Sequence, residues 1–156
     1  MKRREFLKNS AVLSTVLTFG SALNLNANEN LNTRSEKMDT KIILTINKEV
    51  IPATLNSTIA AQEFIKKLPF SLSASKGEFD FCGMGGELKY DPSQTQVGWK
   101  NGDIGYARGW FAIFHSGEER SSEYTSEMII GHIDEKYLQT IKNLPHSVKI
   151  SVELAK

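Results

Sequence analysis

Short apolar segments separated by closely spaced turns constrain the fold of this chain more than any other feature. The segments alternate apolar with polar residues or are rich in β-branched residues, as β-strands are. The strands that we expect cover residues 41–46, 50–55, 70–73, 79–82, 104–106, 110–115, 128–133 and 147–154. Short strands with turns at this spacing are typical of a β-barrel or a β-sandwich. The chain is therefore predicted to be mainly β.

Two short helices are predicted between the strands. The first has an apolar stripe at i, i+3, i+4 and i+7, formed by Ala61, Phe64, Ile65 and Leu68. Asn56, Ser57 or Thr58 can cap its start, and Pro69 ends it. Asp134 is the expected cap of the second helix, whose stripe is formed by Tyr137, Leu138, Ile141 and Leu144. The polar residues 118–127 are expected to form an exposed loop.

The first 27 residues have the layout of an export signal. Arg3-Arg4 is followed by Phe6-Leu7-Lys8, a pattern typical of twin-arginine signals. The apolar residues 11–19 are too few to span a bilayer, which takes roughly 20 residues. We therefore predict a twin-arginine signal over 1–27, a polar linker over 28–40 and a barrel domain over 41–155. The export machinery is then the partner of residues 1–27, and the mature domain is expected to be periplasmic or secreted.

Charge and cysteine content exclude several classes of function. Residues 1–27 carry four basic residues and one acidic residue, so the rest of the chain has a net charge of −2, whereas the whole chain has +1. No basic stripe is present for nucleic acid, and no polybasic patch for a membrane surface after cleavage of the signal. Cys82 is the single cysteine, so no internal disulfide stabilises the fold.

Residues of the types that can bind metals or phosphates do not form a recognisable motif in this sequence. His115, His132 and His146 have no short metal-ligand spacing. Glycines cluster in Gly83-Met84-Gly85-Gly86, but without the strand-to-helix context of a phosphate-binding loop. We read this segment as a bulge or a close approach of two backbones. We expect neither a metal ion nor another cofactor.

The order of the segments resembles the cyclophilin-like fold, and is closest to small bacterial cyclophilin-like proteins of mostly unassigned function. The resemblance rests on residues 54–69, 98–106, 110–114 and 129–134, and it covers roughly residues 41–154. It implies an eight-stranded, mainly antiparallel barrel with a helix over each open end. Side chains fill such a barrel, so a ligand is expected in an outer groove.

The chain departs from the prolyl isomerases of this fold at their catalytic segments. Those enzymes carry a Phe-His-Arg segment, followed by a Phe-Met-x-Gln-Gly-Gly-Asp-Phe segment. Here Gly85-Gly86-Glu87-Leu88 is similar only to part of the second segment, and no Phe-His-Arg precedes it. Arg108, in a turn, is the one arginine available near the expected groove. Its planar guanidinium can donate to a carboxylate or an amide carbonyl, or it can be a solvated turn residue.

These observations favour a binding module, with a peptide or small molecule in a groove beside residues 108–115. The candidate ligand-binding residues are Met84, Glu87, Arg108, Trp110, Phe111, Ile113 and His115. In a strand Trp110 and Phe114 share one face, while Phe111 and Ile113 take the other, so one pair fills the barrel. Two alternatives are a periplasmic prolyl isomerase with a rearranged site and an enzyme that uses Cys82 or the region of His115 and Glu118. Catalytic residues cannot be assigned from the sequence.

Export can be tested by changing Arg3 and Arg4 together to lysine. We expect the precursor to accumulate in the cytoplasm, because the export receptor reads the arginine pair. Cell fractionation followed by immunoblotting measures the distribution. Unchanged export would indicate the general secretory route.

Overall fold

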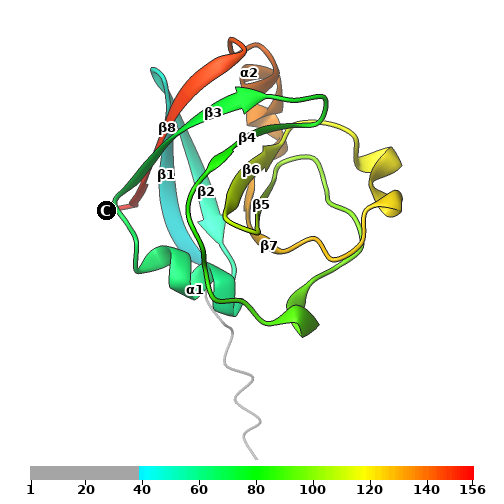
Figure 1. Cartoon of the computed structure of the whole chain (residues 1–156). Coiled ribbons are helices and arrows are strands. Elements are labelled where there is room, and N and C mark those ends of the chain that lie inside the picture. The colour runs from blue at the N-terminus through cyan, green and yellow to red at the C-terminus, as the bar shows by residue number, and fades with distance from the viewer. Residues whose placement is uncertain (1–38) are drawn as a thin grey trace, which may run out of the picture. The chain divides into compact units, whose positions relative to one another are not determined.

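The computed structural model describes residues 39–156, drawn in colour in Figure 1. The predicted signal over 1–27 and all but the end of the predicted linker lie outside these residues. Within the described part, strands make up most of the regular structure, and the helices are short. No helix in that part is long and apolar enough to cross a membrane.

Eight antiparallel strands close into one barrel. In chain order they are β1 Thr40–Ile46, β2 Glu49–Leu55, β3 Phe70–Lys76, β4 Asp80–Met84, β5 Asp103–Ala107, β6 Trp110–Phe114, β7 Ile129–Ile133 and β8 Ser147–Leu154. Around the barrel the order is β1-β2-β7-β5-β6-β4-β3-β8, with β8 hydrogen-bonded back to β1. This architecture confirms the predicted fold class.

Side chains alternate between the inside and the outside of the barrel, as the pleat requires. In β1, Ile42, Leu44 and Ile46 are buried and face the interior, while the residues between them are more exposed. β8 repeats the pattern with Val148, Ile150 and Val152, which is the alternation that its sequence predicted. These residues belong to one continuous core that fills the barrel.

Two helices lie at opposite ends of the barrel, as Figure 1 shows: α1 Ile59–Ile65 and α2 Leu138–Lys142. Thr58 caps α1 by accepting a hydrogen bond from the backbone N–H of Ala61, 3.2 Å away. Asp134 caps the short 3₁₀ helix η3 Glu135–Tyr137 rather than α2, which follows it directly. Both helices contribute side chains to the core.

The structure differs from the sequence-based expectation in one connection. The segment predicted as an exposed loop contains the 3₁₀ helix η2 Glu118–Glu123, whose Ser121 is buried. Polarity did not predict this, because the serine hydroxyl is satisfied by backbone carbonyls. Pro52 lies inside a closed barrel, but the β2–β7 ladder begins only at Ala53. The proline therefore needs no N–H donor on that side.

Phe64 of α1 tests the contribution of the end helix to stability. Its ring is fully buried against Phe70, Tyr106 and Phe111, with centroids 5.3–5.7 Å away. Phe64→Ala is expected to lower the free energy of unfolding by about 3–5 kcal/mol, because the truncation leaves a cavity in the core. Chemical denaturation measures the loss. Ile59→Ala, on the exposed side of the same helix, serves as the control, and a loss of about 1 kcal/mol or less for Phe64→Ala would contradict its core position.

Candidate functional site

A row of small residues hollows the outer face of the barrel where β5, β6 and β4 lie side by side. Ala112 in β6 is the cross-strand partner of Gly105 in β5 and of Cys82 in β4. Ala107, two residues after Gly105, points to the same side as Gly105. A side chain at Gly105 would press against the ring of Phe114, since its Cβ would lie 2.9 Å from that ring. Gly105 therefore makes room for the Phe114 ring, and Ala107 and Ala112 are the other small residues that line the hollow.

Aromatic rings wall one end of the hollow. The rings of Trp99 and Phe114 stack, with centroids 4.4 Å apart and an angle of 11° between the planes. The ring centroid of Tyr124 lies 5.0 Å from that of Trp99, and the ring centroid of Phe79 lies 5.7 Å from that of Trp99. Trp110 comes from the other end of β6 and is half exposed. The result is an open groove with an apolar floor.

We call this hollow the aromatic groove. Its volume is about 370 Å³, and its lining residues are Glu78, Phe79, Asp80, Trp99, Gly105, Tyr106, Ala107, Trp110, Ala112, Phe114, Tyr124 and Glu127. This volume suits a small organic molecule. Trp99 and Trp110 are the two tryptophans of the chain, so both of its indole rings border the groove.

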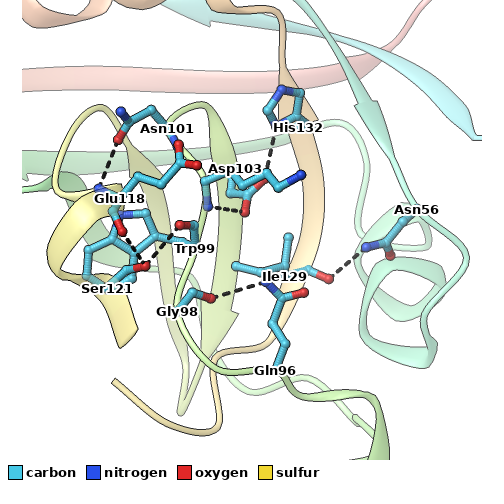
Figure 2. A network of polar contacts seen from close by, with 11 residues as sticks. Asn56, Gln96, Gly98, Trp99, Asn101, Asp103, Glu118, Ser121, Ile129 and His132 are labelled. Atoms are coloured by element: carbon cyan, nitrogen blue, oxygen red, sulfur yellow. Dashed lines mark hydrogen bonds and ion pairs between the residues drawn. The ribbon is translucent and has the colours of Figure 1, made fainter. Parts of the chain in front are cut away.

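The wall is held by hydrogen bonds that run from loop to loop, and Figure 2 shows those that involve Ser121, Asn101 and Glu118. The indole N–H of Trp99 donates to the carbonyl of Ser116 at 2.9 Å, and the carbonyl of Trp99 accepts from the Ser121 hydroxyl at 3.1 Å. Asn101 and Glu118 exchange two further bonds between backbone N–H groups and side-chain oxygens. The loop that carries Trp99 is therefore tied to η2.

A second set of bonds fixes both ends of the same loop. At one end Gln96 and Glu127 exchange backbone hydrogen bonds of 2.9 and 2.8 Å. At the other end the buried carboxylate of Asp103 accepts from the backbone N–H of Lys100 at 2.7 Å and lies 2.9 Å from Nδ1 of His132. The walls of the groove are thus set before a ligand arrives, which lowers the entropic cost of binding.

Two carboxyl groups of the aromatic groove, those of Asp80 and Glu127, have raised pKa values because they are partly buried. Burial raises the pKa of Asp80 above its ordinary range, and hydrogen bonding to its own backbone N–H only partly opposes this. Burial also raises the pKa of Glu127, and the negative charge of Asp80 raises it further. The two groups are therefore close enough for their charges to interact. A third carboxylate, Glu78, pairs with Arg120 at 2.9 Å.

Cys82 is unsuited to nucleophilic chemistry. Burial and the neighbouring charge of Asp80 raise its pKa to about 11, so the thiol stays protonated at neutral pH. Its sulfur packs beside Trp99, Ala112 and Phe114. The geometry gives no support to an enzyme that uses a Cys82 thiolate.

The predicted site residues are only partly brought together. Of the seven candidates, Trp110 lines the aromatic groove. Arg108 occupies a left-handed turn position, with φ of 50°, and lines a separate hollow of about 260 Å³. Met84 is exposed on β4 opposite Trp110. Glu87 is also exposed, and its side chain lies near the Gly109 turn.

The other three candidates are buried and do not border the groove. Phe111 and Ile113 face the barrel interior with 0% exposure, because they are the inward pair of the β6 alternation. His115 is buried against the ring of Phe81, and its backbone N–H donates to the carbonyl of Phe79. Burial and the charge of Lys76 lower the pKa of His115, so its ring is neutral at pH 7. These three residues support the strand rather than contact a ligand in the groove.

Sequence reasoning did not select most of the groove residues. Phe79, Asp80, Trp99, Tyr124 and Glu127 come from three different segments and meet only in the fold. One local signal was present, namely the small residues Gly105, Ala107 and Ala112 at alternate positions of neighbouring strands. Such a row on an outer face indicates a depression, since larger side chains would otherwise cover the sheet.

A larger hollow of about 720 Å³ lies outside β1 and β2, beside η3. Its charged lining residues balance each other: Lys41 and Lys136 against Asp134 and Glu135, with Lys136 3.9 Å from Asp134. His132 borders it and is already oriented by Asp103. Size alone therefore does not make this hollow the better site, because Tyr137 and His132 are the only aromatic rings in its lining and its charges balance. Within residues 39–156, no group of three or more His, Cys, Asp or Glu residues is arranged to hold a metal ion.

Comparison with known proteins identifies the class to which this barrel belongs. The sequence pattern of the cyclophilin-like family matches residues 44–153, so the chain belongs to the cyclophilin-like family. The solution structure of a hypothetical protein from Archaeoglobus fulgidus is similar, with a TM-score of 0.57 and 11% identity over 78% of this chain and 99% of that one. Comparison with the curated proteins gives no match.

A second solved structure has the same fold within a longer chain. It is McbB in complex with tryptophan, with a TM-score of 0.52 and 11% identity over 72% of this chain and 44% of McbB. At this level of identity the similarity shows the fold alone.

The raised pKa values of Asp80 and Glu127 predict how pH affects stability. A folded-state pKa above the unfolded value means that the protonated groups stabilise the fold at acid pH, and that this contribution is lost as pH rises through the raised pKa. Changing Asp80 to Asn and Glu127 to Gln should therefore raise the unfolding midpoint at pH 8, compared with the unchanged chain, and have little effect at pH 3.

Thermal unfolding followed by circular dichroism measures this difference. Glu153→Gln, on the exposed face of β8, removes a matched carboxylate elsewhere and should change neither midpoint. A lower midpoint for the double variant at pH 8 would show that the two carboxylates stabilise the fold.

Proposed function

We propose that this cyclophilin-like domain is a binding module that holds a small organic molecule in the aromatic groove. The observation that carries the proposal is the hollow of about 370 Å³, with stacked aromatic rings on its wall and two carboxyl groups that have no cationic partner within residues 39–156. Apolar surface with a few placed polar groups is the usual composition of a small-molecule site.

The energetics of the groove support a role in binding. Asp80 and Glu127 are partly desolvated, and the charge of Asp80 further disfavours the ionised form of Glu127, so at neutral pH the two groups cost stability rather than contribute to it. Small residues at Gly105, Ala107 and Ala112 leave aromatic surface uncovered. A sheet face that only closed the core would not need either feature. A protein of the same fold, McbB, has been solved in complex with tryptophan.

The same geometry does not favour the isomerase alternative. Arg108 would have to replace the missing catalytic arginine, but it lines a different hollow, with Tyr90, Pro92 and Ser126. The aromatic groove has no arginine among its lining residues. We propose further that residues 1–27 direct export through the twin-arginine route, so that the module acts outside the cytoplasm on a peptide or small molecule there. The arginine pair Arg3-Arg4 supports this part of the proposal.

Binding in the groove can be followed by tryptophan fluorescence, since both tryptophans border it. The probes are 2-phenylethanol, 2-phenylethylamine and 3-phenylpropionate, which share a phenyl body and differ in charge. We expect at least one of them to change the emission of the full-length chain saturably. Ala107→Leu fills the hollow from an exposed position and should weaken that binding about tenfold by steric exclusion.

Ser73→Leu is the matched control, because it adds the same side chain to the exposed face of β3, outside the groove. It should leave the affinity unchanged. Circular dichroism verifies that both variants are folded. If none of the three probes binds, or if Ala107→Leu binds as tightly as the unchanged chain, the groove is not the site.

A further inference from the structure

The aromatic groove carries more negative charge than its neighbours neutralise. Glu78, Asp80 and Glu127 all line it. The guanidinium of Arg120 pairs with Glu78 at 2.9 Å and lies 5.0 Å from the ring centroid of Phe79. No lysine, arginine or histidine within residues 39–156 forms an ion pair with Asp80 or Glu127. Two carboxylates of the groove are therefore without a counter-charge from the described chain.

The backbone places these two carboxylates on opposite sides of the hollow. Asp80 begins β4 and is the cross-strand partner of Phe114, so it stands beside the stacked rings. Glu127 is fixed by the backbone pairing with Gln96, just before β7. Gly105, Ala107 and Ala112 line the same hollow with side chains too small to shield the acids from a ligand.

The other titratable groups around the pair do not supply a positive charge. Glu78 carries the same charge and is already paired, and the thiol of Cys82 stays protonated. Burial raises the pKa of Tyr106 to about 12, so its phenol is neutral at physiological pH. Burial makes ionisation of both acids costly, and a bound cation would reverse that cost. An anionic ligand would add a third negative charge to the same space.

We propose that the aromatic groove selects an organic cation: a protonated amine carried on an aromatic body, with the ammonium group between Asp80 and Glu127 and the ring against Trp99 and Phe114. This inference rests on the proposed function and names the class of its ligand. Charge-assisted hydrogen bonds to the carboxylates give the specificity. The faces of the aromatic wall add apolar contact and attract positive charge through their quadrupoles.

The test compares 2-phenylethylamine with 2-phenylethanol and 3-phenylpropionate on the full-length chain at pH 8 and low salt. We expect the amine to bind about tenfold more tightly than the neutral alcohol, and the carboxylate more weakly than both. Isothermal titration calorimetry gives the three affinities, and tryptophan emission reports binding at the groove. Raising the salt concentration should reduce the preference for the amine, because the two acids are only partly buried.

Two variants separate this inference from the proposed function. Asp80→Asn combined with Glu127→Gln should bring the affinities for amine and alcohol to within about twofold, chiefly by weakening the binding of the amine. Glu153→Gln, a remote carboxylate, should leave the preference for the amine intact. If the three probes bind equally and Ala107→Leu weakens all of them, the groove is a site without charge selection, and this inference fails alone. Tighter binding of the carboxylate, or a preference for the amine that survives the double substitution, would also overturn it.

Discussion

Closure of the sheet on itself is the constraint on which the rest of this structure depends. Because β8 pairs with β1, the ladder has no open end, and every strand sends alternate side chains into one interior. That interior is filled by branched aliphatic residues and by the rings of Phe64, Phe81 and Phe111. A barrel packed in this way holds together without a disulfide and leaves no internal space for a ligand. Recognition is therefore confined to the outer surface.

The aromatic groove follows from how the outer surface is built. Where β4, β5 and β6 meet, the outward residues are small, and two long connections fold over the sheet beside them. These connections are tied together by the bonds of Trp99, Ser121 and Asp103, which hold the wall in place. The barrel thus supplies a rigid floor, and the loops supply the chemistry.

Much of the fold could be predicted from sequence because its signals are local. Alternation in residues 147–154 and the apolar stripe that contains Phe64 each depend on neighbours within one element. Alternation within β6 also predicts correctly that Phe111 and Ile113 lie on the same face of that strand. The sequence does not predict which face of β6 lies inside the barrel, because aromatic residues occupy both faces. Only the closed ladder of strands distinguishes the two faces.

The site could be predicted far less well, because its residues are distant in sequence. Trp110 was selected from its own strand, but Asp80, Trp99 and Glu127 meet it only through long-range pairing of loops with the barrel. Arg108 was selected because its guanidinium can donate several hydrogen bonds. The tight turn directs its side chain to the separate hollow of about 260 Å³ instead. Charge on a residue can be read from sequence, whereas the absence of a partner for that charge can be read only from the fold.

The unpaired acids also explain why the groove is better viewed as a site than as a packing defect. A depression left by chance on a sheet is filled at no cost by a larger side chain or by water. Asp80 and Glu127 instead place ionisable groups where burial opposes their charge, next to stacked rings that raise the local apolarity. Neutral side chains of the same size would relieve this penalty without altering the backbone. In the proposed complex, a bound cation would reverse this penalty. The stability of the fold would then be coupled to occupancy of the groove, since a ligand that binds only the folded state stabilises it.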